Sequence, residues 1–162
     1  MHYDSSLAAI EREVKFPKFV FDQITATKAN PANVVVKKEH LAQFKKIITG
    51  MKKLSAHTVK PKTGKSYKSY ICAMDFMASQ IVVTFDKDYI PSNSPENNPT
   101  TARGSSKVEA KNNGARIELV INPSYVLDAL SGFNADVEIR ITKTFVLFTC
   151  GTRDALIMRM VK

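Results

Sequence analysis

The last third of the chain, Gly114 to Lys162, follows a pattern that few folds accommodate. Residues Ala115–Ile121 alternate between apolar and polar side chains, as a half-buried strand does. A helical segment follows, and then three more short apolar runs separated by polar breaks. These runs are Val137–Thr142, Phe145–Cys150 and Leu156–Val161. The pattern predicts one unit of strand, helix and three strands.

The helical segment of this unit carries its own start and stop signals. Asn122 is a good N-cap, and Pro123 is tolerated in a first helical turn. Gly132 is placed to end the helix. Between them, apolar side chains recur at helical spacing: Tyr125, Val126, Ala129, Leu130 and Phe133.

A second pattern lies in the charge. The formal net charge of the 162 residues is +9. Lysines are concentrated between Lys28 and Lys68, where Glu39 is the only acidic residue. Such a localised charge favours an anionic partner for one surface. The alternative is a solvated helix face or a mobile loop, which is the usual role of a charge run.

The strongest predicted helix, Lys38–Leu54, lies within this basic window. Its apolar side chains form one stripe: Leu41, Phe44, Ile47, Ile48, Met51 and Leu54. At 100° per residue, Lys46 and Lys53 point directly away from that stripe, and Lys38 lies toward the same side. Lys45 and Lys52 flank them. The helix is therefore expected to pack by one face and to offer ammonium groups from the other.

The pattern before Gly114 repeats the element order of the last third. Four segments are strand-like, namely Ala32–Val36, Tyr67–Asp75, Gln80–Asp86 and Lys107–Lys111. Residues Ala56–Lys65 are a basic hairpin or loop, and Asp88–Ser106 is a long polar loop. Residues 32–111 thus repeat the order strand, helix and three strands. Met1–Val14 fits a short helix, the alternative being an edge strand through Ile10–Phe16, and Ile24–Asn33 fits a connector.

Three stretches of the last third resemble the final domain of the bacterial DNA polymerase III beta subunit, the sliding clamp. They are INPSYVLDALSGF, the V-x-I-x-I strand that follows it, and the C-terminal IMRMVK, where Arg159 replaces the proline usual in that family. Phe16–Phe19 (FPKF) also resembles the segment by which clamps enter their last domain. The resemblance covers about residues 16–162. It implies an α+β clamp domain at 31–162, after an N-terminal extension at 1–30, with helices on one face of antiparallel sheets. Family chains have three such domains.

The resemblance also implies a function, a processivity factor of DNA replication. Clamp helices line the hole of a ring, so the first helix would face duplex DNA with Lys38, Lys45, Lys46, Lys52 and Lys53. The second helix carries Asp128 as its only charge. Clamps also capture polymerases and other factors through short peptides with glutamine, leucine and phenylalanine anchors. That pocket would comprise Pro17, Asn122, Tyr125, Met158, Met160 and Val161, unless the two methionines only pack in the core.

Three alternatives concern how such a domain would work. A chain with a single such domain could encircle DNA only if several copies associated head to tail as a homo-oligomer. An interaction module that binds peptides without encircling DNA is the second possibility. A basic nucleic-acid binder of unrelated fold is the third, and it would be mostly helical.

Enzyme chemistry has little support in the sequence. The histidines His2, His40 and His57 lie far apart without ligand partners at metal spacing, and no phosphate-binding glycine loop occurs. Asp75, Asp86 and Asp88 cluster loosely, as aspartates at strand ends commonly do. We therefore expect no cofactor and no metal. Cys72 and Cys150 lie in strand patterns and are expected to be buried free thiols, which favours the cytoplasm. No apolar run is long enough to span a membrane, and Met1–Lys15 does not match a secretory signal.

Overall fold

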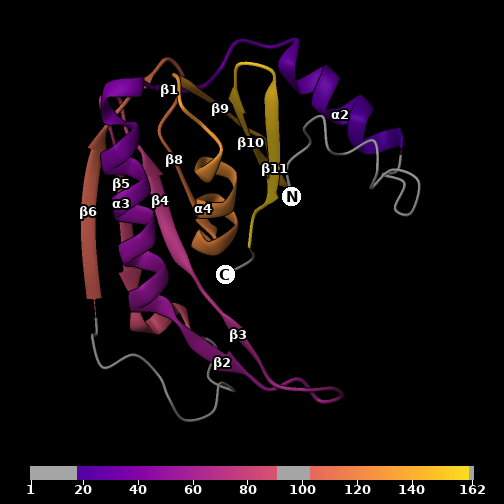
Figure 1. The fold of residues 1–162 in the computed structure, drawn as a ribbon, viewed down its shortest axis with the longest axis vertical. Coiled ribbons are helices and arrows are strands. Elements are labelled where there is room, and N and C mark those ends of the chain that lie inside the picture. The colour runs from indigo at the N-terminus through magenta and orange to yellow at the C-terminus, as the bar shows by residue number, and fades with distance from the viewer. Residues whose placement is uncertain (1–17, 91–102, 161–162) are drawn as a thin grey trace.

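A computed structural model describes residues 18–90 and 103–160 of the chain. It has two strand-helix-three-strand units, as the sequence predicted (Figure 1). The first unit comprises β1 (Val34–Val36), α3 (Lys38–Ser55), β4 (Cys72–Phe76), β5 (Gln80–Asp86) and β6 (Arg103–Glu109). The second comprises β8 (Ile117–Ile121), α4 (Pro123–Ser131), β9 (Val137–Ile141), β10 (Phe145–Cys150) and β11 (Arg153–Met158). Smaller elements are α2 (Lys18–Lys28), β2 (His57–Val59), β3 (Tyr67–Ser69), the 3₁₀ turn η1 (Lys87–Tyr89) and β7 (Lys111–Asn112).

Each unit lends its first strand to the other unit's sheet. One sheet has the order β6-β5-β4-β8, so the first strand of the second unit completes the meander of the first. The other has the order β11-β10-β9-β1-β7, in which β1 pairs antiparallel with β9. The register places Val34 opposite Ile139 and Ala73 opposite Val120. The two units are therefore interlocked through their sheets.

The chain that follows the last strand of each unit also crosses to the other sheet. After β6 the chain continues as β7, which pairs with β1 through Val34 and Asn112. After β11 the chain reaches Met160, whose backbone N–H donates to the Val120 carbonyl of β8 at 2.8 Å. Both sheets thus end on a strand extension from the partner unit.

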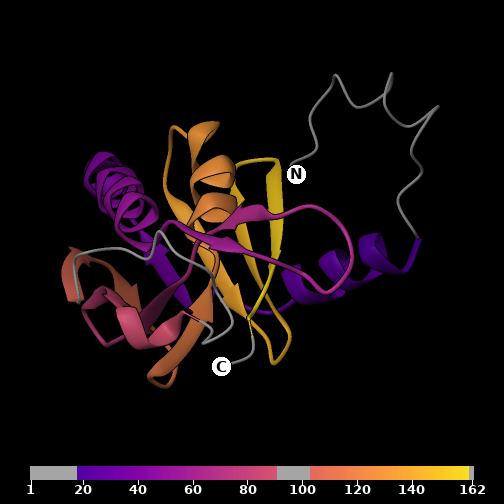
Figure 2. The ribbon, with the colours of Figure 1, turned by 90° about the horizontal axis from the view of Figure 1, so that it is seen from below.

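The two long helices of the units lie side by side on one side of the sheets (Figures 1 and 2). On α3 the predicted stripe is buried, except that Leu54 is only half-buried while Ser55 is fully buried. The core beneath them contains large, fully buried side chains from both units, among them Phe44, Phe76, Phe85 and Phe148. Burying aromatic side chains of this size is the largest favourable contribution of a core such as this one. Among the described residues, no helix is long and apolar enough to cross a membrane.

Several local predictions need correction. The predicted connector Ile24–Asn33 is helical as far as Lys28, because α2 occupies Lys18–Lys28. The predicted strand Tyr67–Asp75 is split into β3 and β4, since β3 pairs with β2 in a separate hairpin. The strand expected to start at Lys107 starts at Arg103, so the polar loop predicted to reach Ser106 ends earlier.

One further correction concerns the last strand, and two predictions cannot be compared. β11 runs from Arg153 to Met158, earlier than the predicted Leu156–Val161. The alternatives for Met1–Val14 lie outside the described residues, as do Phe16 and Pro17 of the FPKF segment. Lys18 and Phe19, the rest of that segment, begin α2.

Candidate nucleic-acid interface and partner surface

The five lysines predicted to face DNA differ in their solvent exposure and in their partners within the fold. Lys38, Lys46 and Lys53 are exposed, whereas Lys45 and Lys52 are half-buried at the flanks of α3. This is the distribution that the helical periodicity predicts. In the described part of the chain, Lys46 and Lys53 have no hydrogen bond or ion pair, so their ammonium groups are available to an external anion.

The two flanking lysines have partners inside the fold. The Lys45 ammonium donates to the Phe133 carbonyl at 2.8 Å, just past the C-terminal end of α4. A cation at this end of a helix is favourable, because the free carbonyls there carry partial negative charge. Lys52 Nζ lies 5.3 Å from the centre of the Tyr70 ring, a cation–π contact. These two side chains therefore stabilise the fold as well as adding positive charge to its surface.

The N-terminal end of α3 is capped from the other unit. Lys37, the N-cap residue, makes no side-chain capping bond. Instead, the Lys38 backbone N–H donates to Asp136 Oδ1 at 2.8 Å, and Lys37 Nζ lies 3.4 Å from Asp136 Oδ2. The backbone hydrogen bond, with a smaller effect from Lys37, lowers the pKa of Asp136 below its ordinary value. By contrast, α4 uses its predicted local cap, Asn122 Oδ1, which accepts from Ser124 N–H at 2.9 Å.

Beyond the C-terminal end of α3, the chain forms a hairpin of β2 and β3. In Figure 1 this hairpin extends away from the sheets and the helices. We call residues His57–Ser69 the basic arm, because its exposed residues include Lys60, Lys62, Lys65 and Lys68. The sequence indicated its charge and its hairpin or loop character, but it did not assign these lysines to a site.

Some of the residues predicted to form the partner pocket lie near one another in the structure. Met160 is half-buried against the core, and its backbone pairs with Val120, two residues before the helix cap Asn122. The end of the last strand and the start of α4 therefore meet. Two large side chains at these elements are exposed, Tyr125 at 58% and Met158 at 61%. Core packing thus does not account for Met158, and it accounts for Met160 only in part. Pro17 and Val161 lie outside the described residues.

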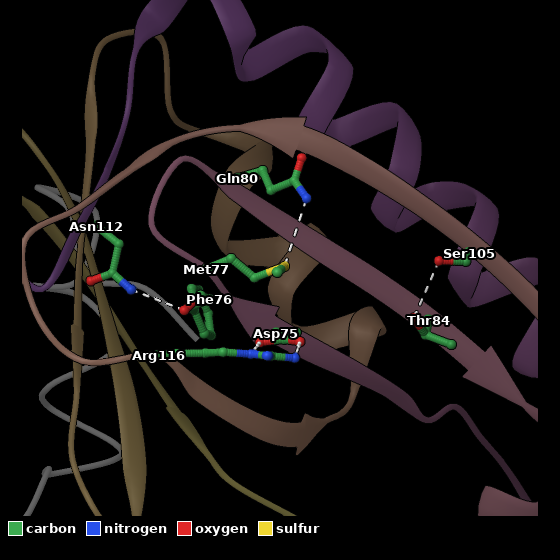
Figure 3. A network of polar contacts seen from close by, with 8 residues as sticks. All are labelled: Asp75, Phe76, Met77, Gln80, Thr84, Ser105, Asn112 and Arg116. Carbon is green, nitrogen blue, oxygen red and sulfur yellow. Dashed lines mark hydrogen bonds and ion pairs between the residues drawn. The ribbon is translucent and has the colours of Figure 1, made fainter.

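Two of the three clustered aspartates, Asp75 and Asp86, are paired with arginines. Asp75 accepts two hydrogen bonds from Arg116, at 3.0 and 2.6 Å (Figure 3). Asp86 accepts two from Arg103, at 3.1 and 2.9 Å, and it also caps η1 through the Asp88 N–H. Those bonds, with the backbone bond dominant, lower the pKa of Asp86. Among the described residues, no group of three or more potential ligands could hold a metal ion.

The histidines and cysteines have structural surroundings. His40 Nε2 lies 2.6 Å from Glu109 Oε2, and the buried His57 shares a 2.7 Å hydrogen bond with the Ser55 carbonyl. Both cysteines are buried and free, as predicted. Burial raises the pKa of the Cys72 thiol to about 12, which keeps it neutral and unreactive at physiological pH.

Comparison with known proteins connects this geometry to one group of structures. No family model matches the sequence, and no curated protein matches it. Solved structures do match. The DNA polymerase sliding clamp of Pseudomonas aeruginosa aligns with a TM-score of 0.59 and 17% identity over 93% of this chain and 36% of the clamp.

Two further clamps align with this chain to a similar extent. The DnaN sliding clamp of Bartonella birtlesii, solved with griselimycin bound, has a TM-score of 0.59 at 13% identity, over 93% of this chain and 35% of its own. The beta sliding clamp of Caulobacter crescentus has a TM-score of 0.58 at 15% identity, over 82% and 31%. This chain therefore spans about a third of the length of the clamps it matches. Its fold is that of a domain of the bacterial DNA polymerase III beta sliding clamp.

Proposed function

We propose that this protein is a non-catalytic, clamp-like processivity factor of the cytoplasm that contacts duplex DNA without reading its sequence. The observation that carries the proposal is the outer face of α3. Its exposed lysines have no carboxylate partner in the described chain, on a fold whose structural neighbours are DNA polymerase III subunits.

The chemistry of that face suits sliding. Lysine ammonium groups contact phosphates as mobile point charges, and they gain affinity from counterion release rather than from base edges. The helix that carries them is held by a buried stripe on its other side and by Asp136 at its start. A rigid helix with mobile charged ends can stay close to DNA while the contacted phosphates change.

Charge reversal tests the DNA contact. We expect the Lys46→Glu/Lys53→Glu variant to bind duplex DNA of any sequence more weakly, with a shallower dependence of affinity on salt. The matched control is Lys18→Glu/Lys143→Glu, which makes the same charge change at exposed positions of α2 and the β9–β10 turn. Equal effects of the two variants would mean that net charge, not α3, governs binding. Unchanged binding in the α3 variant would remove α3 from the interface.

Encirclement of DNA would require self-association. β6 and β11 are terminal strands of the two sheets, and each has one side unpaired within the described chain. Pairing of β6 in one copy with β11 in the next would be head-to-tail and would remove both edges. The net charge of +9 opposes this assembly unless DNA is present. Retention on circular but not on linear DNA is the expected sign of a ring, and equal loss from both would contradict one.

A second candidate function is peptide capture without a ring, favoured by the exposure of Tyr125 and Met158 beside the C-terminal strand extension. Exposed aromatic and methionine side chains suit adaptable docking of apolar anchors. Fluorescence polarisation with a peptide carrying glutamine, leucine and phenylalanine anchors tests it. Tyr125→Ala/Met158→Ala is a better variant than deletion of residues 160–162, because the deletion also removes the pairing of Met160 with Val120. No binding by the unmodified protein would end this proposal.

A further inference from the structure

We propose that the basic arm, His57–Ser69, is a second contact with duplex DNA, which grips the phosphate backbone beyond the reach of α3. The inference rests on the proposed DNA contact of this fold and adds a separate element to it. It starts from the charge of the arm, the way its base is held, and its direction.

The arm is a cluster of uncompensated positive charge. No acidic residue occurs between Glu39 and Asp75, and the arm contributes Lys60, Lys62, Lys65 and Lys68, all exposed. None of the four has a hydrogen bond or an ion pair in the described chain. Several cations elsewhere are paired, namely Lys28 with Asp154, Lys37 with Asp136, Arg103 with Asp86, and Arg116 with Asp75, whereas the arm lysines share with Lys46 and Lys53 the lack of a described partner. Among residues 18–90 and 103–160, the charge of the arm therefore serves no ion pair.

The base of the arm is fixed to α3. Ser55, the last residue of α3, is fully buried, and its hydroxyl accepts from the Ile71 N–H at 3.1 Å on the far side of the arm. His57, at the start of β2, is also buried and hydrogen bonds to the Ser55 carbonyl. Lys52 on the last turn of α3 lies over the ring of Tyr70. These contacts fix the base of the arm to the helix that carries Lys46 and Lys53.

Beyond this base, the arm has little structural role. Its side chains from Lys60 to Lys68 are exposed, except for the half-buried Pro61, and Figure 1 shows it extending away from the body of the molecule. The turn at its tip is built by Gly64, whose φ of +99° favours glycine. Such an extension adds little to the stability of the fold, but it offers several ammonium groups to an external polyanion.

The arm fits DNA in its dimensions as well as its charge. Strand pairing covers His57–Val59 and Tyr67–Ser69, and about six residues from the base to the tip have an extended reach of at most about 20 Å at the usual rise of a strand. That length corresponds to about six base pairs along a duplex. A two-stranded ribbon is also narrow enough to enter the major groove. The contact is expected mainly with phosphates, because the charged side chains of the arm are lysines, which act as mobile point charges, and the arm has no arginine, asparagine or glutamine.

The test removes three charges from the arm and compares an equal loss elsewhere. The arm variant is Lys60→Gln/Lys62→Gln/Lys65→Gln, and the control is Lys18→Gln/Lys111→Gln/Lys143→Gln, which are exposed lysines outside α3 and the arm. Both should keep the Tm of the unmodified protein, because all six side chains are exposed. For the arm variant we expect the slope of log affinity against log salt to fall by up to about 2.7, at about 0.9 per lost phosphate contact. The control should leave it nearly unchanged.

Duplex length provides a second measurement. As the duplex is shortened, the unmodified protein should begin to lose affinity at a length about six base pairs greater than the arm variant does, because only its arm contacts those additional phosphates. Identical length dependence and identical salt slopes in the two proteins would overturn the inference. Loss of single-stranded binding alone, reproduced by Tyr67→Leu, would also overturn it, because base stacking on the exposed Tyr67 would then explain the arm.

The outcome separates this inference from the proposed function. If only the arm variant binds DNA weakly, the arm contact stands and the α3 contact fails. If only Lys46→Glu/Lys53→Glu binds weakly, the α3 contact stands and the arm contact fails. If the unmodified protein does not bind duplex DNA at all, both fail.

Discussion

The helices α3 and α4 occupy equivalent places in the two units, yet they present opposite surfaces. Residues Lys38–Ser55 give α3 a lysine-rich outer face, whereas α4 has one charge, Asp128, and an exposed tyrosine, Tyr125. Their inner faces are alike, because both bury apolar side chains in one core. The difference shows that this fold constrains the inner face of each helix and leaves the outer face free for function. Four predictions test that separation.

The largest effect should come from the inner faces, and it should be similar for the two helices. Phe44→Ala on α3 and Leu130→Ala on α4 each empty a fully buried position. We expect losses of about 3–5 and 2–5 kcal/mol in the free energy of unfolding, measured by urea denaturation. A small loss at Phe44 alone would mean that α3 is an appendage rather than part of the core.

The next effect separates two adjacent lysines of α3. Lys45→Met removes the hydrogen bond to the Phe133 carbonyl at the end of α4, so we expect a loss of about 1 kcal/mol. Lys46→Met should leave stability unchanged within about 0.5 kcal/mol, because this side chain is exposed. For DNA affinity we expect the opposite order. Equal stabilities of the two variants would contradict the assignment of Lys45 to the seam between the helices.

A smaller effect concerns the two N-caps and depends on pH. The folded pKa of Asp136 lies below its ordinary value of 3.8, so its ionised cap stabilises the fold above that pH. This stability is lost as the pH falls through the folded pKa. Asp136→Asn should therefore lower the Tm at neutral pH and reduce the further loss in acid. Asn122→Ala removes the uncharged cap of α4, and we expect a loss of about 1 kcal/mol in the free energy of unfolding. This loss should be the same at neutral and at acidic pH. Parallel acid profiles for Asp136→Asn and the unmodified protein would contradict this.

The smallest effect should come from giving α4 a positive charge like those on the outer face of α3. Asp128 is exposed on α4, and Asp128→Lys would give that helix a positive outer face. If α4 also faces the duplex, affinity should rise and the salt slope should steepen by about 0.9, one phosphate contact. An unchanged slope would restrict the DNA-facing surface to α3 and the basic arm. Asp128→Asn, which removes the negative charge without adding a positive one, is the control.

Much of the fold followed from the sequence, because helical and strand periodicity determine which side of an element is buried. The stripe on α3, the cap at Asn122 and the repeated element order were all predicted. The start of β6 was not: Gly104, Ser105 and Ser106 have weak strand preferences, and pairing with β5 holds them in the sheet. The role of Lys45 was also hidden, because its partner carbonyl lies 88 positions away. The exchange of β1 and β8 could not be predicted either, since a two-residue period does not identify the neighbouring strand.

That exchange has a consequence for how the chain acquires its structure. β1 is held by β9, and Asn33 Oδ1 accepts from the Ile141 N–H 108 positions later in the chain. The N-terminal part of the core is therefore incomplete until the C-terminal part has formed. Such long-range closure slows folding and joins both halves into one cooperative transition. Although β1 has only three residues, its amides should therefore exchange with solvent as slowly as those of the long strands, through global opening alone. A fragment containing either unit alone would lack a strand of its sheet, and mixing the two fragments should restore what neither can form.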